Sequence, residues 1–281
     1  MKSGPTAPTP FVFPARLDRV RASLARQERA LRQVAGWYAD ALAAGGVVHA
    51  YANGHSRIAI EEMAVRLGAL AGFHALLADG LTSFVDVVGP SGIRVNQALE
   101  RVEGLGAVLL DEFEVGAREP LLVVSATGQT AAAVDVAGEW VRRYPDNPLI
   151  ALCGREQARR GKPKHSSGRT LWHIVRQARH GVLLDNGMPY GDLSVRVRGL
   201  RGEYDICPLS SIGALAVVQS LNELTLRELD RRGYVHAVLR NMHTGSTRVN
   251  YDTWLRDQRT RYARCLHHPA ALAGPEPEAP A

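Results

Sequence analysis

The sequence predicts an α/β protein: a three-layer α/β/α sandwich around a parallel sheet of about five strands. Short apolar runs alternate with helical patterns from residue 46 to residue 184. Several of these runs lead through a short turn directly into a helical pattern, the order that builds a parallel sheet with helices on both faces. Two of the turns, at residues 53–56 and 125–130, combine glycine with hydroxyl side chains.

The first expected element is a long amphipathic helix over residues 15–44. Apolar residues recur there at three- and four-residue steps, and Gly45-Gly46 ends the pattern. The apolar face of this helix either packs on its own sheet or pairs with a second subunit.

The later elements follow from the same patterns. Apolar runs bounded by turn residues predict strands at 46–52, 120–125, 148–153, 181–184 and 235–239. Helical periodicity predicts helices at 57–70, 96–113, 130–143, 168–179, 209–232 and 251–265. The segments 73–88 and 193–197 are ambiguous, and each is long enough for a short additional strand.

The chain of 281 residues is expected to form a single folded domain over residues 14–265. Residues 1–13 contain three prolines and no periodicity, and residues 266–281 are rich in Ala, Pro, Glu and Gly. Both terminal segments are therefore expected to be disordered.

Composition argues against several classes of function. The net charge is +6, but Arg is interleaved with Glu and Asp as on solvated helix faces, so we expect no nucleic-acid partner. No apolar run approaches the roughly 20 residues that span a bilayer, and the start of the chain lacks the apolar core of a signal peptide. We therefore expect a cytoplasmic protein without a membrane partner. Three scattered cysteines provide neither a disulfide framework nor a metal site, and no cofactor is expected.

The turn Ser125-Ala126-Thr127-Gly128-Gln129-Thr130 lies between a buried strand and a helix start. A helix N-terminus presents unpaired N–H groups and about half a positive charge, which favours an anion such as phosphate. The alternative is an ordinary Ser or Thr helix cap.

The upstream turn Asn53-Gly54-His55-Ser56 has the same setting. In a parallel sheet, ligands bind outside the carboxyl ends of the strands, so two such turns are able to converge on one ligand. Neither turn has the glycine and lysine spacing of a nucleotide-binding loop. A single phosphate suits this hydroxyl-lined pair better than a nucleotide triphosphate.

Together the two turns resemble the SIS (sugar isomerase) family, with Thr127 in place of the usual serine. Further matches are Glu61-Glu62, His165-Ser166-Ser167-Gly168, Asp185-Asn186 and Ser210-Ser211, and they point to a bacterial branch similar to phosphoheptose isomerase. The resemblance spans about residues 15–264. It implies a flavodoxin-like five-stranded sheet, a sugar-phosphate ligand, and a homodimer or homotetramer.

Carried onto this sequence, the resemblance implies a set of residues that bind substrate or phosphate. These are Asn53, Gly54, His55, Ser56, Ser125, Thr127, Gly128, Gln129, Thr130, Asp185 and Ser211. The backbone N–H groups of Gly128 and Gln129 are expected to assist the hydroxyls. For Asp185, the local alternative is the turn chemistry of Asp-Asn-Gly.

Isomerisation of a sugar phosphate needs a base that moves a proton between adjacent carbons. The resemblance favours Glu62 over Glu61 as this base, and His165 as the group that opens the ring or shuttles a proton. The alternative for Glu62 is a solvated helix residue paired with Arg66 four positions later.

Three functions follow from these residues. The leading one is an aldose–ketose sugar-phosphate isomerase. The alternatives are a sugar-phosphate-binding sensor without catalysis and an amino-sugar-phosphate lyase or etherase, since one fold hosts several reactions.

Overall fold

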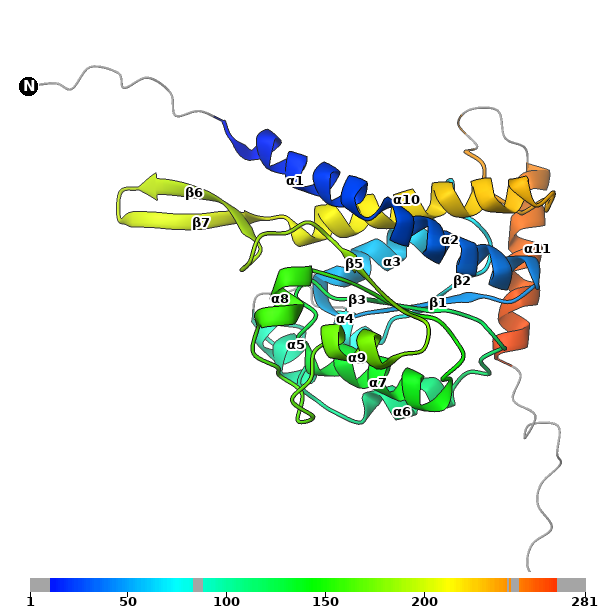
Figure 1. Ribbon diagram of the computed structural model, residues 1–281, viewed down its shortest axis with the longest axis horizontal. Coiled ribbons are helices and arrows are strands. Elements are labelled where there is room, and N and C mark those ends of the chain that lie inside the picture. The colour runs from blue at the N-terminus through cyan, green and yellow to red at the C-terminus, as the bar shows by residue number, and fades with distance from the viewer. Residues whose placement is uncertain (1–10, 83–87, 242, 244–247, 267–281) are drawn as a thin grey trace, which may run out of the picture.

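The computed structural model describes residues 11–82, 88–241, 243 and 248–266. Its centre is a parallel five-stranded sheet of order β2-β1-β3-β4-β5 (Figure 1). The strands are β1 (Val48–Ala52), β2 (Phe73–Leu76), β3 (Leu121–Val124), β4 (Leu149–Cys153) and β5 (Gly181–Asp185). This strand order is the flavodoxin-like one, so the predicted fold class is confirmed.

Helices cover both faces of the sheet (Figure 1). One face packs against α2 (Glu28–Ala43), α3 (Arg57–Ala64) and α10 (Ser210–Arg231). The other packs against α6 (Leu105–Asp111), α7 (Ala131–Arg143), α8 (Arg155–Arg160) and α9 (Leu171–Gln177). The remaining helices are α1 (Phe13–Arg26), the short η1 (Gly54–Ser56), α4 (Asp79–Thr82), α5 (Ile93–Leu99) and α11 (Arg248–Cys265).

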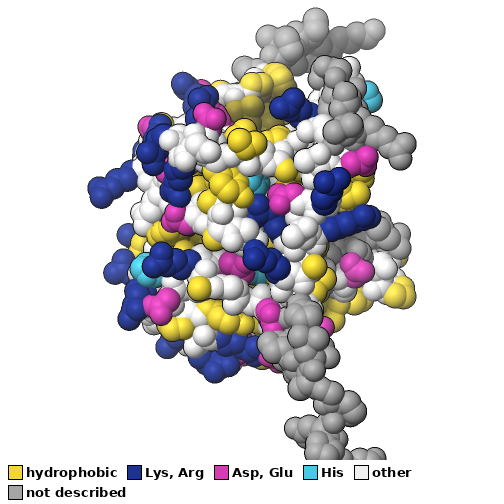
Figure 2. Space-filling view, turned by 90° about the vertical axis from the view of Figure 1, so that its right-hand side faces the viewer, with side chains coloured by type: hydrophobic (Ala, Val, Ile, Leu, Met, Phe, Trp, Pro, Cys, Tyr) yellow, Lys and Arg dark blue, Asp and Glu magenta, His cyan; other side chains and the backbone are white. Residues whose placement is uncertain are grey.

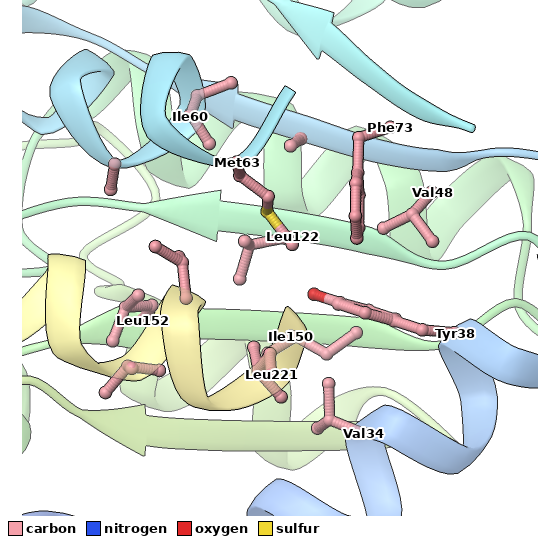
Figure 3. Close-up of a cluster of buried hydrophobic side chains, with 14 of the residues drawn as sticks. Val34, Tyr38, Val48, Ile60, Met63, Phe73, Leu122, Ile150, Leu152 and Leu221 are labelled. Carbon is pink, nitrogen blue, oxygen red and sulfur yellow. The ribbon is translucent and has the colours of Figure 1, made fainter. Parts of the chain in front are cut away.

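The core explains why the strands are continuous apolar runs. Every residue of β1, β3 and β4 is buried, because helices cover both of their faces. Figure 3 shows one of the two resulting clusters, in which Tyr38 and Phe73 lie beside Leu122 and Ile150.

The long helix expected at 15–44 is two helices, α1 and α2, which meet at Gln27. The Gln27 side-chain amide donates to the Asp185 carbonyl and accepts from the Asp185 N–H, both at 2.7 Å. The helix is therefore interrupted at Gln27, a buried residue whose side chain satisfies the backbone N–H and C=O of Asp185 at the end of β5.

Two expectations near the edge of the sheet were wrong for one reason. The helix expected at 57–70 ends at Ala64, and the strand expected at 235–239 is reduced to one bridge, between Leu70 and Val238. The Gly68 N–H donates to the Leu239 carbonyl at 2.6 Å, and the Ala71 N–H donates to the Ala237 carbonyl at 3.0 Å. Backbone pairing between these two segments thus replaces the last turns of the helix.

Two further helices have other bounds than those predicted. The helix expected at 96–113 is divided into α5 and α6 by Gly104, whose φ of +92° lies in the left-handed region. The helix expected at 168–179 begins later, at Leu171, and α8 was not expected from the sequence.

The ambiguous segment at 193–197 belongs to a hairpin that projects from the domain beside α1 (Figure 1). Its strands, β6 (Leu193–Gly199) and β7 (Gly202–Pro208), pair in antiparallel fashion and form a sheet of their own. The other ambiguous segment supplies β2, which pairs with β1 at the edge of the main sheet.

Basic and acidic side chains are interspersed on the face shown in Figure 2. Among the described helices, none is long and apolar enough to cross a membrane. The terminal segments expected to be disordered lie outside the described residues, apart from 11–13 and 266.

A buried polar network lies where β1 and β2 begin, at the amino end of the sheet. His49 Nδ1 lies 3.0 Å from His74 Nδ1, and His49 Nε2 lies 3.1 Å from a carboxylate oxygen of Glu119. The Glu119 carboxylate also accepts the N–H groups of Val47 and Gly116. These three donors lower the pKa of Glu119 despite its burial.

We expect this network to make stability depend on pH. Burial lowers the pKa of His74 to about 3, whereas a histidine in an unfolded chain titrates near 6.5. Above about pH 6.5 the His74 ring is uncharged in both the folded and the unfolded chain. As the pH falls below that value, only the unfolded chain binds the proton, so the free energy of unfolding decreases.

Urea unfolding of wild type and His74→Asn between about pH 7.5 and 5 tests this expectation. The wild type should lose more stability over this interval than the variant. His180→Asn, at an exposed position, should keep the wild-type slope. Equal slopes for wild type and His74→Asn would contradict the assignment.

Candidate functional site

The candidate site lies at the carboxyl ends of β1 and β3. These strands are adjacent in the sheet, with Ala52 of β1 paired to Val124 of β3. In the order β2-β1-β3-β4-β5, β2 lies on one side of β1 and the later strands lie on the other, so the strand order reverses at β1. In open α/β sheets, ligands bind in the crevice at such a switch point. The fold therefore brings together the two turns that the sequence singled out.

The first turn follows β1 and starts α3. Asn53 is extended, and Gly54 has a φ of +59° that favours glycine. The Asn53 side-chain amide donates to Glu100 Oε1 at 2.6 Å. Ser56 Oγ accepts the backbone N–H of Ala126 at 3.1 Å, so this turn is bonded directly to the second one.

The second turn is closed by its own hydroxyl groups. Ser125 Oγ accepts the Gly128 N–H at 3.1 Å, and Thr127 Oγ1 accepts the Gln129 N–H at 3.3 Å. The N–H groups of Gly128 and Gln129 are thus used inside the turn, which corrects the expectation that they point at a phosphate. Thr130 is the N-cap of α7, and its side chain makes no capping hydrogen bond.

Gln129 was expected to contact the ligand, but its side chain is hydrogen-bonded to α8 and to the segment after it. It donates to the Lys162 carbonyl at 2.6 Å and accepts from the Gln157 side-chain amide at 2.8 Å. Gln129 therefore fixes the loop that carries Lys164 against the second turn.

Four predicted residues line one narrow pocket of about 10 Å³ between these turns and the start of α10: His55, Ser56, Ser125 and Ser211. Asn186 and Ser210 also line it. Asn186 is 1% exposed and donates to the Ala126 carbonyl at 3.2 Å, whereas Ser210 donates to Asp192 at 2.7 Å. The pocket is consequently polar and rich in hydroxyl groups.

Three of the predicted residues outside this lining, Glu62, Asp185 and His165, are held by partners elsewhere in the structure. Glu62 faces α10, where it accepts from the Gln219 amide at 2.8 Å and pairs with Arg66 at 2.9 Å. Asp185 Oδ1 accepts the N–H groups of Arg155 and Gly187, both at 3.2 Å. This is the turn chemistry of the local alternative, and it also anchors the start of α8.

His165, the third of them, links several elements on the other side of α7. Its Nδ1 accepts the Ser167 N–H at 3.0 Å and lies 2.8 Å from Ser167 Oγ. Nε2 lies 3.5 Å from a carboxylate oxygen of Glu103 and 3.7 Å from one of Asp135. The His165 ring therefore lies beside two carboxylates, one in the segment between α5 and α6 and one in α7, and its Nε2 has no hydrogen-bond partner among the described residues.

Sequence reasoning missed Glu100, Asn186 and Ser210. Asn186 and Ser210 lay in segments that carried the family resemblance, so a signal for them was present. Glu100 lies at the end of α5, more than 40 residues from Asn53, and no local motif marks it. Within the part of the chain that the structure describes, no group of three His, Cys, Asp or Glu residues could hold a metal ion.

Both a family model and individual proteins are similar to this chain. The family model described as "SIS domain" matches residues 13–154, half of the chain. A UPF0309 protein from Streptomyces griseus is 29% identical over 203 residues, covering 72% of this chain and 76% of that protein. A UPF0309 protein from Listeria monocytogenes is 25% identical, covering 76% and 82%. Among solved structures, a phosphoheptose isomerase from Francisella tularensis has a TM-score of 0.47 at 15% identity, covering 76% of this chain and 94% of that one.

Gly128 should be indispensable for the second turn. Its φ is +69°, and a Cβ there would lie 2.8 Å from the Ala158 Cβ and 2.9 Å from Cys153 Sγ. Gly68 is a matched control, because it has a φ of +93° and nothing within 4 Å of a Cβ. Both alanine variants carry backbone strain, and overpacking should cost Gly128→Ala about 1–3 kcal/mol more. Urea unfolding measures the difference, and equal losses would show that the turn tolerates a side chain.

Proposed function

Since the chain belongs to the SIS domain family, we propose that it binds a sugar phosphate in the crevice between β1 and β3. The observation that carries this proposal is the bonding of the hydroxyl groups around the second turn. The oxygens of Ser56, Ser125 and Thr127 each accept a backbone N–H of that turn. A hydroxyl that accepts in this way still has its own proton to donate, and a phosphate oxygen is a strong acceptor.

The surroundings also suit an anion. Thr130 directly precedes the 13-residue helix α7, whose N-terminal end carries partial positive charge. Ser211 adds a hydroxyl from the start of α10, and the net charge of +6 favours the approach of an anionic ligand. The pocket is narrow, so its walls have to separate when a phosphate enters.

For the reaction, we propose aldose–ketose isomerisation of the bound sugar phosphate. Sequence resemblance assigned the base to Glu62 and proton shuttling to His165. In this structure Glu62 contacts Gln219 and Arg66. His165 lies beside Glu103 and Asp135. Either residue would have to leave these partners in order to reach the crevice.

We further propose that residues 14–265 act as one SIS domain that assembles into a homodimer or homotetramer. Leu17 of α1 is 39% exposed, and Ile212 and Leu226 of α10 are each 37% exposed, so apolar side chains are available on both helices. Light scattering at micromolar concentration tests the assembly, and a 30.5 kDa monomer would contradict it.

The phosphate site is tested by a thermal-shift screen with pentose, hexose and heptose phosphates. A ligand present at about 100 times its dissociation constant stabilises the protein by about 2.7 kcal/mol. For a ligand that stabilises the wild type, Ser125→Ala and Thr127→Val should each weaken binding by about 1.5–3 kcal/mol, since each removes a hydrogen bond to a charged group. Ser220→Ala, which removes a hydroxyl bonded only within α10, should bind as wild type does. Wild-type affinity in both turn variants would refute the site.

Incubation of the same ligand in deuterium oxide separates the three functions. Isomerisation exchanges solvent deuterium into C2 of the sugar phosphate. Binding without exchange would favour a sensor, and exchange with loss of the C3 substituent would favour a lyase or etherase.

A further inference from the structure

A second cavity, of about 180 Å³, lies on the other side of the second turn. Its lining is Gln97, Glu100, Arg101, Thr130, Ala131 and Lys164. The turn is shared, since Ser125 at its start lines the narrow pocket and Thr130 at its end lines this cavity. A ligand whose phosphate is held by the turn is therefore able to place its other end here.

Glu100 is the carboxylate of this cavity, and two hydrogen bonds fix it. Its side chain accepts from the Asn53 amide at 2.6 Å, and its backbone carbonyl accepts the Ala132 N–H in the first turn of α7 at 3.1 Å. A Cβ on Gly54 would lie 2.7 Å from Glu100 Oε1, so the turn after β1 also approaches this oxygen closely. The carboxylate is thus held between the turns that follow β1 and β3.

The environment of Glu100 is that of an acid–base group. Burial raises its pKa, while the Asn53 hydrogen bond and the charges of Lys164 and His55 act in the opposite direction. A carboxylate with a raised pKa is a stronger base than a solvated one and releases its proton again near neutral pH. Arg101 and Lys164 supply positive charge around the same cavity.

One polar atom beside Glu100 has no partner. Asn53 is only 5% exposed, and its buried Oδ1 accepts no hydrogen bond from the described residues. A buried acceptor without a donor is costly, and a hydroxyl of a bound ligand would satisfy it. This favours a polyhydroxylated ligand in the cavity.

We propose that Glu100 transfers the proton between C1 and C2 of the bound sugar phosphate, with Lys164 stabilising the oxygen that becomes negative. The inference rests on the proposed function and names the residues that would perform it. The Glu100 carboxylate removes the proton from C2 of the open-chain aldose, and the C–H electron pair forms the C1–C2 double bond. The carbonyl electrons move onto the C1 oxygen, beside the Lys164 ammonium. The proton of the C2 hydroxyl then passes to the C1 oxygen, the C2 carbonyl forms, and the double-bond electrons take the proton back from Glu100 at C1, so the ketose forms without another reactant.

Glu100 fits this role better than Glu62 for a geometric reason. Glu62 is engaged by Gln219 and Arg66 on the α10 side of α3. Glu100 lines a cavity at the switch point of the sheet together with Thr130. A general base has to lie within hydrogen-bond reach of the proton that it abstracts.

The test compares Glu100→Gln with wild type, using a sugar phosphate from the thermal-shift screen. Glutamine keeps an oxygen for the Asn53 amide but is not a base. We expect deuterium exchange into C2 to slow by about 10²–10⁴-fold, with little change in the thermal shift that the sugar phosphate or inorganic phosphate produces. In wild type the exchange rate should rise with pH through the pKa of Glu100, and the variant should lack this rise. Glu112→Gln, at an exposed position, should exchange as wild type does.

The possible results separate this inference from the proposed function. If no sugar phosphate stabilises the wild type, the binding proposal fails and the role of Glu100 fails with it. If the wild type binds and exchanges deuterium, but Glu100→Gln exchanges equally fast, only the assignment to Glu100 is overturned. If the variant exchanges slowly but has also lost the thermal shift with inorganic phosphate, Glu100 supports the fold of the site instead.

Lys164→Met supplies a second measurement. Removal of the ammonium should lower the rate constant for exchange and leave the rise with pH in place, because Glu100 is still the base. A variant with the wild-type rate constant would overturn the part assigned to Lys164.

Discussion

The hydrogen bond from the Ala126 N–H to Ser56 Oγ joins the two turns on which the proposed site depends. It forms because the chain places β1 next to β3, so that two segments 70 residues apart leave the sheet side by side. Hydroxyl oxygens then satisfy the backbone of a buried turn, while their own protons remain available to donate. Structural and proposed ligand-binding roles are thus carried by the same oxygen atoms.

Two buried carboxylates, one at each end of the sheet, differ in their hydrogen-bond partners. At the amino end, the Glu119 carboxylate has three donors and a lowered pKa, so the network stabilises the fold near neutral pH. At the carboxyl end, Glu100 has a raised pKa and Asn53 Oδ1 lacks a donor. Incomplete satisfaction of this kind is expected where a ligand supplies the missing contacts. The unpartnered Asn53 oxygen beside Glu100 therefore supports the proposed ligand at the carboxyl end of the sheet.

Close approach of backbones at glycine keeps the site compact. Gly128 lies against Ala158 and Cys153, and a Cβ on Gly213 of α10 would lie 1.7 Å from the Asn186 carbonyl oxygen. The second contact brings Ser210 and Ser211 to the same pocket as Asn186. Side chains from four separate segments therefore converge on a pocket that no single segment forms.

The sequence by itself determined the α/β class, the central strands and the two hydroxyl turns, because strand–turn–helix order and apolar runs are local signals. It also singled out Ser56, Ser125 and Ser211, which line one pocket in the structure. Tertiary structure decided the break at Gln27, the end of α3 at Ala64 and the partners of Glu62, Gln129 and Asp185. It alone brought Glu100 to Asn53. Each of these depends on hydrogen bonds between segments far apart in the chain, whose strength local patterns do not encode.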